Sequence, residues 1–173
     1  EAAMRGELDF SASLTRRVAL LAGLEASALE RVYEERLRLS PGAETMLAAV
    51  RKAGLKTLLV SGGFTFFTDR LKARLGLDYA HANVLEVENG RLTGRVVGGI
   101  VDAEEKMRTV ARVCAELGVD TRRAIVMGDG ANDLRMMGIG GLSVAFRAKP
   151  VVRAQADVAL NVSGLDGVLA VLA

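Results

Sequence analysis

Apolar residues recur with a helical period over the first third of this chain, and later in short runs that alternate with helical stretches. Residues 11–22 and 27–38 show the helical spacing, and Ser11 is the predicted N-cap of the first of these helices. Ser40-Pro41 predicts a cap followed by proline at the first helical position, and Gly54 predicts the end of that helix. The chain is therefore expected to begin with helices only.

Strand-like and helical segments alternate from residue 55 onward. Short apolar runs predict strands over 55–60, 124–127, 142–146 and 157–161. Helical patterns predict helices over 64–75, 102–117, from about 132, after Lys149-Pro150 and over 165–172, with Gly76 and Gly118 as stops and with Asp102 and Glu105 as a capping box.

The segment 84–97 is a predicted β-hairpin, because Asn89-Gly90 suits a type I′ turn. Strands that alternate with helices imply βαβ units. We therefore expect an α/β fold, with a Rossmann-like parallel sheet and helices on both faces over 39–173. A partial helical cap is expected over 1–38, and the hairpin is expected to form a flap.

Composition and charge narrow the classes of function. The formal net charge is +2 and the basic residues are scattered, so nucleic-acid binding has no support. No apolar run reaches the length of a membrane span, so no membrane partner is expected. The single cysteine, Cys114, is expected to be a small core residue, which suits a reducing cytoplasm.

Two features in the middle of the chain have the chemistry to bind phosphate. In Ser61-Gly62-Gly63, a hydroxyl and two amides can donate to phosphate oxygens at the start of a helix, although a turn that needs positive φ explains the glycines as well. Lys106 lies in the first turns of its helix and could reach a phosphate as a compact cation. A lone lysine is more often a solvated surface residue.

The segment Gly128-Asp129-Gly130-Ala131-Asn132-Asp133 directly follows a predicted strand and is the strongest chemical signal. Asp129 ends that strand, where a carboxylate can bind Mg²⁺. Asp133 could orient Lys106 or a metal-bound water, and Asn132 could donate to phosphate. An Asx-type turn before a capped helix accounts for one aspartate but not for the whole set. We therefore expect a magnesium and phosphate site here.

These motifs resemble, in order and spacing, motifs two, three and four of the haloacid dehalogenase superfamily of phosphohydrolases. The segment 4–18 resembles the cap of the phosphoserine phosphatases, as do the hairpin residues 89–94 and Ala148-Lys149-Pro150. The resemblance covers essentially the whole chain. It implies a Mg²⁺-dependent hydrolysis of L-phosphoserine to serine and phosphate, the last step of serine biosynthesis, through an aspartyl-phosphate.

The resemblance also implies which residues hold the phosphoryl group. Ser61 and Lys106 would stabilise the charge on the transferring group, and Asp133 would anchor Lys106. Gly62 and Asn132 would contact phosphate. Phosphoryl transfer depends mainly on positioning and charge neutralisation, so these residue types fit the reaction.

The resemblance assigns further residues to the metal and to the cap. Asp129 would be a Mg²⁺ ligand. Arg17 would pair with the substrate carboxylate, while Met4 and Phe10 would shape the pocket. Without the resemblance, Arg17 is better explained as a solvated helix arginine, and Met4 and Phe10 as ordinary apolar packing.

The chain departs from the superfamily in its first motif. Residues 1–173 contain no Asp-x-Asp pair. They also lack the acidic residue that members use, shortly after that motif, to bind the substrate amino group. In the family that strand lies mid-sheet, so its loss would expose unpaired backbone. We therefore expect that the molecule includes a further segment. We also expect no turnover from the 173 residues alone, because no aspartyl-phosphate can form.

Two other functions are compatible with the same motifs. One is another superfamily phosphatase or phosphotransferase that acts on a different small phosphate ester. The other is a nucleophile-free homologue that binds a phosphorylated metabolite without hydrolysing it. A small-molecule substrate is expected in each case, and a homodimer is left open.

Overall fold

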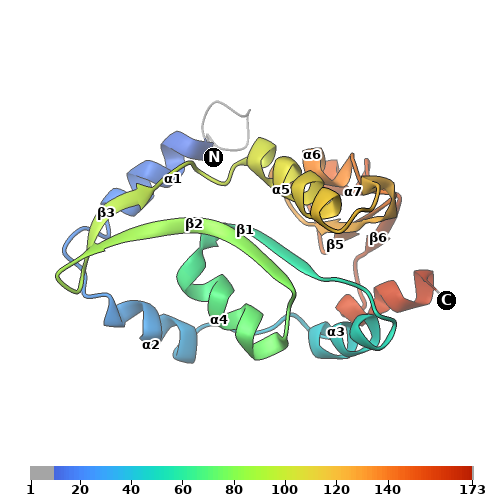
Figure 1. Cartoon of the computed structure of the whole chain (residues 1–173), viewed down its shortest axis with the longest axis horizontal. Helices are drawn as coiled ribbons and strands as arrows, with labels where there is room; N and C mark the ends of the chain where they lie inside the picture. The colour runs from blue at the N-terminus through green and yellow to red at the C-terminus, as the bar shows by residue number, and fades with distance from the viewer. Residues whose placement is uncertain (1–9, 173) are drawn as a thin grey trace. The chain divides into compact units, whose positions relative to one another are not determined.

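The structure is a computed structural model that describes residues 10–172 (Figure 1). The chain forms two compact units. Unit 1 comprises the residues up to Arg38 together with Leu59–Asp102, and unit 2 comprises Leu39–Leu58 together with the chain from Ala103 onward. Within the described residues, no helix is both long and apolar enough to cross a membrane.

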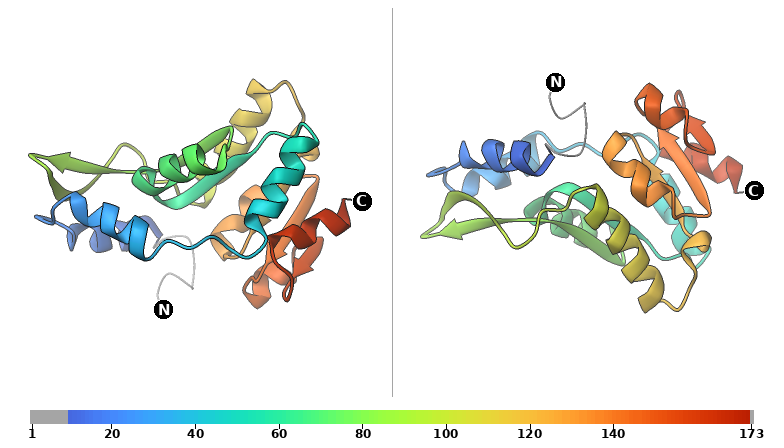
Figure 2. Two further views of the ribbon diagram at one scale, coloured as in Figure 1. Left: turned by 90° about the horizontal axis from the view of Figure 1, so that it is seen from below. Right: turned by 90° about the horizontal axis from the view of Figure 1, so that it is seen from above.

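Unit 1 is built on a three-stranded sheet of order β1-β2-β3, formed by β1 (Leu58–Phe64), β2 (Tyr79–Glu88) and β3 (Arg91–Val97). Its helices are α1 (Phe10–Ala19), α2 (Ser27–Glu35) and α4 (Thr65–Leu75). Helix α4 packs against β2 and helix α1 against β3 (Figure 2).

The turn between β2 and β3 confirms the predicted hairpin. Val84 pairs with Val97 and Glu88 with Arg91 in antiparallel register. Asn89 and Gly90 have φ of 50° and 77°, as the two central residues of a type I′ turn require.

A short loop between α1 and α2 docks on this hairpin. The Gly23 amide donates to the Leu92 carbonyl at 2.8 Å, and the Leu92 amide donates to the Leu24 carbonyl at 2.8 Å. Arg91 forms an exposed ion pair with Glu25 at 3.2 Å. The loop therefore acts as a short extra strand that ties the helical segment to β3.

Unit 2 contains the parallel strands β4 (Ile125–Gly128), β5 (Leu142–Phe146) and β6 (Val158–Leu160). Figure 1 shows helices α5 (Ala103–Glu116) and α6 (Leu134–Met137) over one face of this sheet. Helix α3 (Ala43–Lys52) and the 3₁₀ helix η5 (Leu165–Val171) lie on the other face. The shorter elements are η3 (Thr121–Arg123), η4 (Ala131–Asp133) and α7 (Pro150–Arg153). The predicted α/β fold with parallel strands is confirmed.

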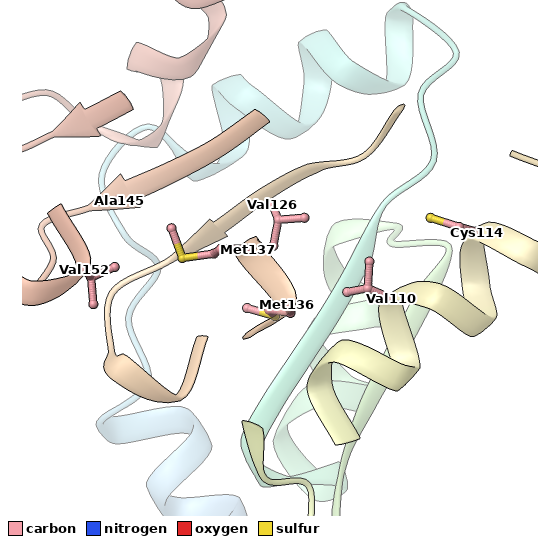
Figure 3. Close-up of a cluster of buried hydrophobic side chains, with 7 residues drawn as sticks. All are labelled: Val110, Cys114, Val126, Met136, Met137, Ala145 and Val152. Carbon is pink, nitrogen blue, oxygen red and sulfur yellow. The ribbon is translucent and has the colours of Figure 1, made fainter. Parts of the chain in front are cut away.

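The core of unit 2 lies between its sheet and helices α5 and α6 (Figure 3). Its buried members are Val110, Cys114, Val126, Met136, Met137, Ala145 and Val152. Cys114 is a free core thiol, as predicted, and burial raises its pKa. A thiol that stays protonated is a poor nucleophile, so Cys114 has a packing role.

Several predicted element boundaries are wrong. Ser11 lies inside α1, because the helix already includes Phe10. Helix α3 begins at Ala43 rather than at Pro41, and its N-cap is Gly42 with φ of 77°. A Cβ on Gly42 would overlap the Asp166 carboxylate, so a contact from far along the chain fixes this start. The last helix is a 3₁₀ helix.

Ser143 and Asp157 lock the beginning of β5 to the residue before β6. The Ser143 hydroxyl and amide donate to Asp157 Oδ2 at 2.6 and 2.8 Å, and the Asp157 amide donates back to Ser143 Oγ at 2.9 Å. The side-chain hydrogen bond from Ser143, followed by its backbone amide, lowers the pKa of Asp157.

Asp157→Asn is expected to reduce the acid sensitivity of the fold. Because the folded-state pKa is lowered, this carboxylate stabilises the protein above its ordinary pKa of about 3.9, and the contribution is lost as pH falls through the lower folded value. Melting temperatures measured from about pH 6 to about pH 2 should therefore fall less steeply for the variant than for the wild type. Parallel curves for the two proteins would contradict the assignment.

Candidate functional site

The predicted site residues fall into two groups, one in each unit, and each group is described within its own unit. In unit 1, Ser61-Gly62-Gly63 forms the end of β1 rather than a turn after it, because the strand continues to Phe64. The glycines do not have positive φ, so the alternative of a strained turn is wrong. They stand in extended backbone, directly before the N-terminus of α4.

Ser61 is oriented by its own segment. The Gly63 amide donates to Ser61 Oγ at 3.0 Å. Since the hydroxyl oxygen accepts this bond, its proton is left to donate to a ligand. A Cβ on Gly63 would approach Ser61 Oγ to 3.1 Å, so a glycine here leaves room for the serine side chain.

Asn83, in β2, forms hydrogen bonds with the same segment, and it belongs to none of the sequence motifs. Its Nδ2 donates to the carbonyls of Gly62 and Gly63 at 2.9 and 3.2 Å, and its Oδ1 accepts from the Val101 amide at 2.8 Å. The residue is only 1% exposed. The signal that could have found it is an asparagine between two apolar residues, Ala82 and Val84, in a strand.

The predicted cap residues have different surroundings. Phe10 is half-buried, and a Cβ added to Gly62 would lie 2.8 Å from its ring carbon Cζ. Arg17 is exposed in the last turn of α1 and makes no ion pair with another described residue. Met4 lies outside the described residues. The structure therefore brings Phe10 against the Ser61-Gly62-Gly63 segment.

In unit 2, Lys106 and Asp133 form a buried ion pair. Lys106 Nζ lies 2.7 Å from Asp133 Oδ1, and the two residues are 6% and 5% exposed. The alternative of a solvated surface lysine is therefore wrong. A buried lysine and aspartate need each other, because either charge alone would be costly in this environment.

Asp133 also shapes the loop after β4. Its Oδ2 accepts from the amides of Asp129 and Gly130 at 3.0 and 3.2 Å. A Cβ on Gly128 would lie 2.5 Å from the Asp133 Cβ, so the close return of the chain requires glycine there. The backbone of the loop GDGAND is thus held by hydrogen bonds to one buried carboxylate, that of Asp133.

Asp129 is held by its backbone and presents its side chain outward. Its amide bonds to Asp133, and its carbonyl accepts from the Lys149 amide at 3.0 Å. The side chain is exposed, and no other described residue hydrogen-bonds to its carboxylate. Asn132 is half-buried in the same loop.

The donor set suits a hard cation that takes few ligands from the protein. Over residues 10–172 there is no group of three His, Cys, Asp or Glu side chains that could hold a metal. Mg²⁺ is commonly bound through one or two carboxylates, with water and phosphate oxygens as further ligands. One outward-facing carboxylate on a fixed backbone fits that role.

Comparison with known proteins gives a consistent family. Residues 2–138 match the haloacid dehalogenase-like hydrolases. A curated phosphoserine phosphatase from Polaromonas sp. is 57% identical over 174 residues, which cover 98% of this chain and 74% of that protein. One from Streptomyces coelicolor is 54% identical, and the match covers 99% of this chain but 42% of that protein.

Solved structures agree with the sequence matches. An unliganded probable phosphoserine phosphatase from Vibrio cholerae has a TM-score of 0.92 at 43% identity, and the match covers 98% of this chain and 52% of that one. A substrate-bound phosphoserine phosphatase complex has a TM-score of 0.91 at 36% identity, with 98% and 80% covered. The chain thus spans about half of the Vibrio protein and about three-quarters of the Polaromonas one.

Proposed function

We propose that this chain, which belongs to the haloacid dehalogenase-like hydrolases and to the phosphoserine phosphatases among them, serves the hydrolysis of L-phosphoserine to serine and phosphate. The observation that carries the proposal is the buried pair of Lys106 and Asp133 beneath the GDGAND loop. Removing a lysine and an aspartate from water is costly, so their burial as a pair indicates that both charges are needed for the function.

Lys106 is proposed to stabilise the phosphoryl group in the transition state. Its ammonium has three donors, and Asp133 uses one of them at 2.7 Å, so the others can bind phosphate oxygens. Because Asp133 fixes the position of Nζ, the charge needs little reorganisation when the substrate binds. Asn132, in the same loop, is proposed to donate to the phosphate.

Ser61 and Gly62 are also proposed to contact phosphate. The Ser61 hydroxyl proton is available because its oxygen accepts from Gly63. The following helix α4 starts at Thr65, and the positive end of its dipole favours an anion nearby.

Asp129 is proposed to be the protein ligand that this chain gives to a Mg²⁺ ion. Its carboxylate has no competing partner among the described residues, and its backbone is fixed at both the amide and the carbonyl. The ion would neutralise phosphate charge and orient the substrate.

Arg17, Phe10 and Met4 are proposed to line the side of the substrate that carries the amino acid. Arg17 is exposed and has the planar fork that suits a carboxylate. The division into a cap over 1–38 and a core over 39–173, the hairpin as a flap, a homodimer and a cytoplasmic location remain parts of this proposal.

The proposal can be tested with two proteins. One is the 173-residue chain, which contains no Asp-x-Asp pair. The other, called here the completed enzyme, joins this chain to the part of the Polaromonas protein that lies outside the match. With Mg²⁺, the completed enzyme is expected to release phosphate from L-phosphoserine faster than from other small phosphate esters, and the chain alone to release none.

Different results would select other functions. Equal rates across the esters would favour a general phosphatase, and binding of L-phosphoserine without hydrolysis by the completed enzyme would favour a binding homologue. In the same assay, Arg17→Ala should raise KM for L-phosphoserine about 10-fold or more, since a bond to a charged group contributes about 1.5–3 kcal/mol. An ester without a carboxylate should be unaffected. Arg16→Ala, one position earlier on α1, serves as the matched control.

A further inference from the structure

We infer that Asn83 is a positioning residue, which sets the conformation of the phosphate-binding segment Ser61-Gly62-Gly63 without touching the substrate. The inference rests on the proposed function and adds to it a residue outside the four sequence motifs. Asn83 is the only asparagine among the buried polar residues of the described chain, with 1% of its surface exposed.

The amide group of Asn83 forms hydrogen bonds through both its nitrogen and its oxygen. The amino group donates to two consecutive carbonyls, those of Gly62 and Gly63, at 2.9 and 3.2 Å. The carbonyl oxygen accepts from the Val101 amide at 2.8 Å. Both ends of a buried side chain are therefore engaged, and each loss would leave a buried polar group without a partner.

The bonds from Asn83 Nδ2 restrict the backbone of the two glycines. Two consecutive glycines are the most freely rotating backbone a chain can have, yet phosphate binding needs their peptide groups to be held in one orientation. Because Asn83, in the neighbouring strand, forms hydrogen bonds with both carbonyls, it restricts the backbone dihedral angles of Gly62 and Gly63. The orientation of Ser61 depends on the same segment through the Gly63 amide.

The oxygen of the Asn83 side chain accepts from the amide of Val101. Val101 is 2% exposed and lies just before α5, the helix that carries Lys106. One side chain thus hydrogen-bonds both to the phosphate-binding segment and to the backbone of Val101. A hydrophobic residue in β2 could pack in the strand, but it could not do either.

The sharpest test is Asn83→Asp, which keeps the size of the side chain. When ionised, the introduced carboxylate can still accept from the Val101 amide, but it has no proton for the two glycine carbonyls and repels them. Burial and these carbonyls raise the pKa of such a carboxyl, and the protonated form can donate again. The variant should therefore regain function as pH falls from about 8 to about 5.

Two measurements decide the outcome. In the ¹⁵N-labelled completed enzyme at about pH 8, the amides of Gly62 and Gly63 should exchange with solvent faster in Asn83→Asp than in the wild type, and the difference should shrink toward about pH 5. In the completed enzyme, kcat should fall about 10- to 100-fold at high pH, more than KM rises, and recover at low pH relative to the wild type.

Ser143→Ala is the matched control, because it breaks a hydrogen-bonded pair in unit 2 that lies outside the proposed machinery. It should lower the melting temperature without a pH-dependent loss of kcat. Unchanged glycine exchange in Asn83→Asp would overturn the inference, whether or not phosphate is released. A loss of kcat that does not change with pH, as simple destabilisation would give, would overturn it too. If the wild-type completed enzyme releases no phosphate, the proposed function fails, and the exchange data still decide the role of Asn83.

Discussion

Lys106→Met is expected to destabilise the chain by about 3–5 kcal/mol and to abolish turnover of the completed enzyme. The stability loss follows because Asp133, 5% exposed, would lose the buried partner that lies at 2.7 Å. The loss of activity follows because a positioned cation at the phosphoryl group is removed, which costs at least about 100-fold in related cases. Urea unfolding and phosphate release, both measured on the completed enzyme, report the two effects separately.

A double variant distinguishes the two roles of this lysine. Lys106→Met with Asp133→Asn removes both charges but keeps an oxygen for the amides of Asp129 and Gly130. It should recover most of the lost stability, since the pair no longer leaves one buried charge. Activity should stay absent. Recovery of turnover along with stability would show that Lys106 acts only as structure.

Asp129→Asn is expected to leave the fold intact while it removes most of the turnover and weakens the dependence on Mg²⁺. The side chain is exposed and no described residue bonds to its carboxylate, so folding loses little. A metal clamp contributes several kcal/mol to the transition state, so the expected loss in kcat is about 100-fold or more. Titration of the completed enzyme with Mg²⁺ should show a higher half-saturating concentration.

Glu116→Gln is a suitable control for this experiment, because it neutralises another exposed carboxylate of unit 2. It should change neither turnover nor the Mg²⁺ titration. Near-normal activity of Asp129→Asn would show that the metal ligand is placed at the wrong residue. An unfolded Asp129→Asn variant would show instead that the loop needs this carboxylate.

Most of the fold could be predicted from local patterns. The hairpin is a good example, because Asn89-Gly90 carries the required positive φ angles in its own two residues. The predicted strand over 142–146 has the bounds of β5, since its apolar run is bounded by glycine and charge. The start of α3 could not be predicted, because Gly42 owes its place to Asp166, a contact that no local pattern contains.

The site could be predicted only where its residues lie in motifs. The resemblance pairs Lys106 with Asp133, and the structure adds that both are buried, which sequence spacing cannot give. Asn83 escapes prediction because its partners are backbone groups of Gly62, Gly63 and Val101, and backbone groups leave no trace in a sequence. Residue types reveal chemistry, whereas hydrogen bonds to the main chain become visible only in three dimensions.

The docking of the Gly23–Leu24 loop on β3 makes the hairpin a natural reporter for helix α1. Because the Gly23 and Leu92 amides tie the two segments together, a displacement of α1 should carry the hairpin with it. The chain has one cysteine, the buried Cys114, so an exposed cysteine from Glu88→Cys would take a fluorescent label selectively. The fluorescence of a label at the hairpin tip would then report movement of helix α1, which carries Arg17, during substrate binding, without a probe on that helix. An emission that stays constant while Arg17 engages substrate would mean that the two segments are mechanically independent.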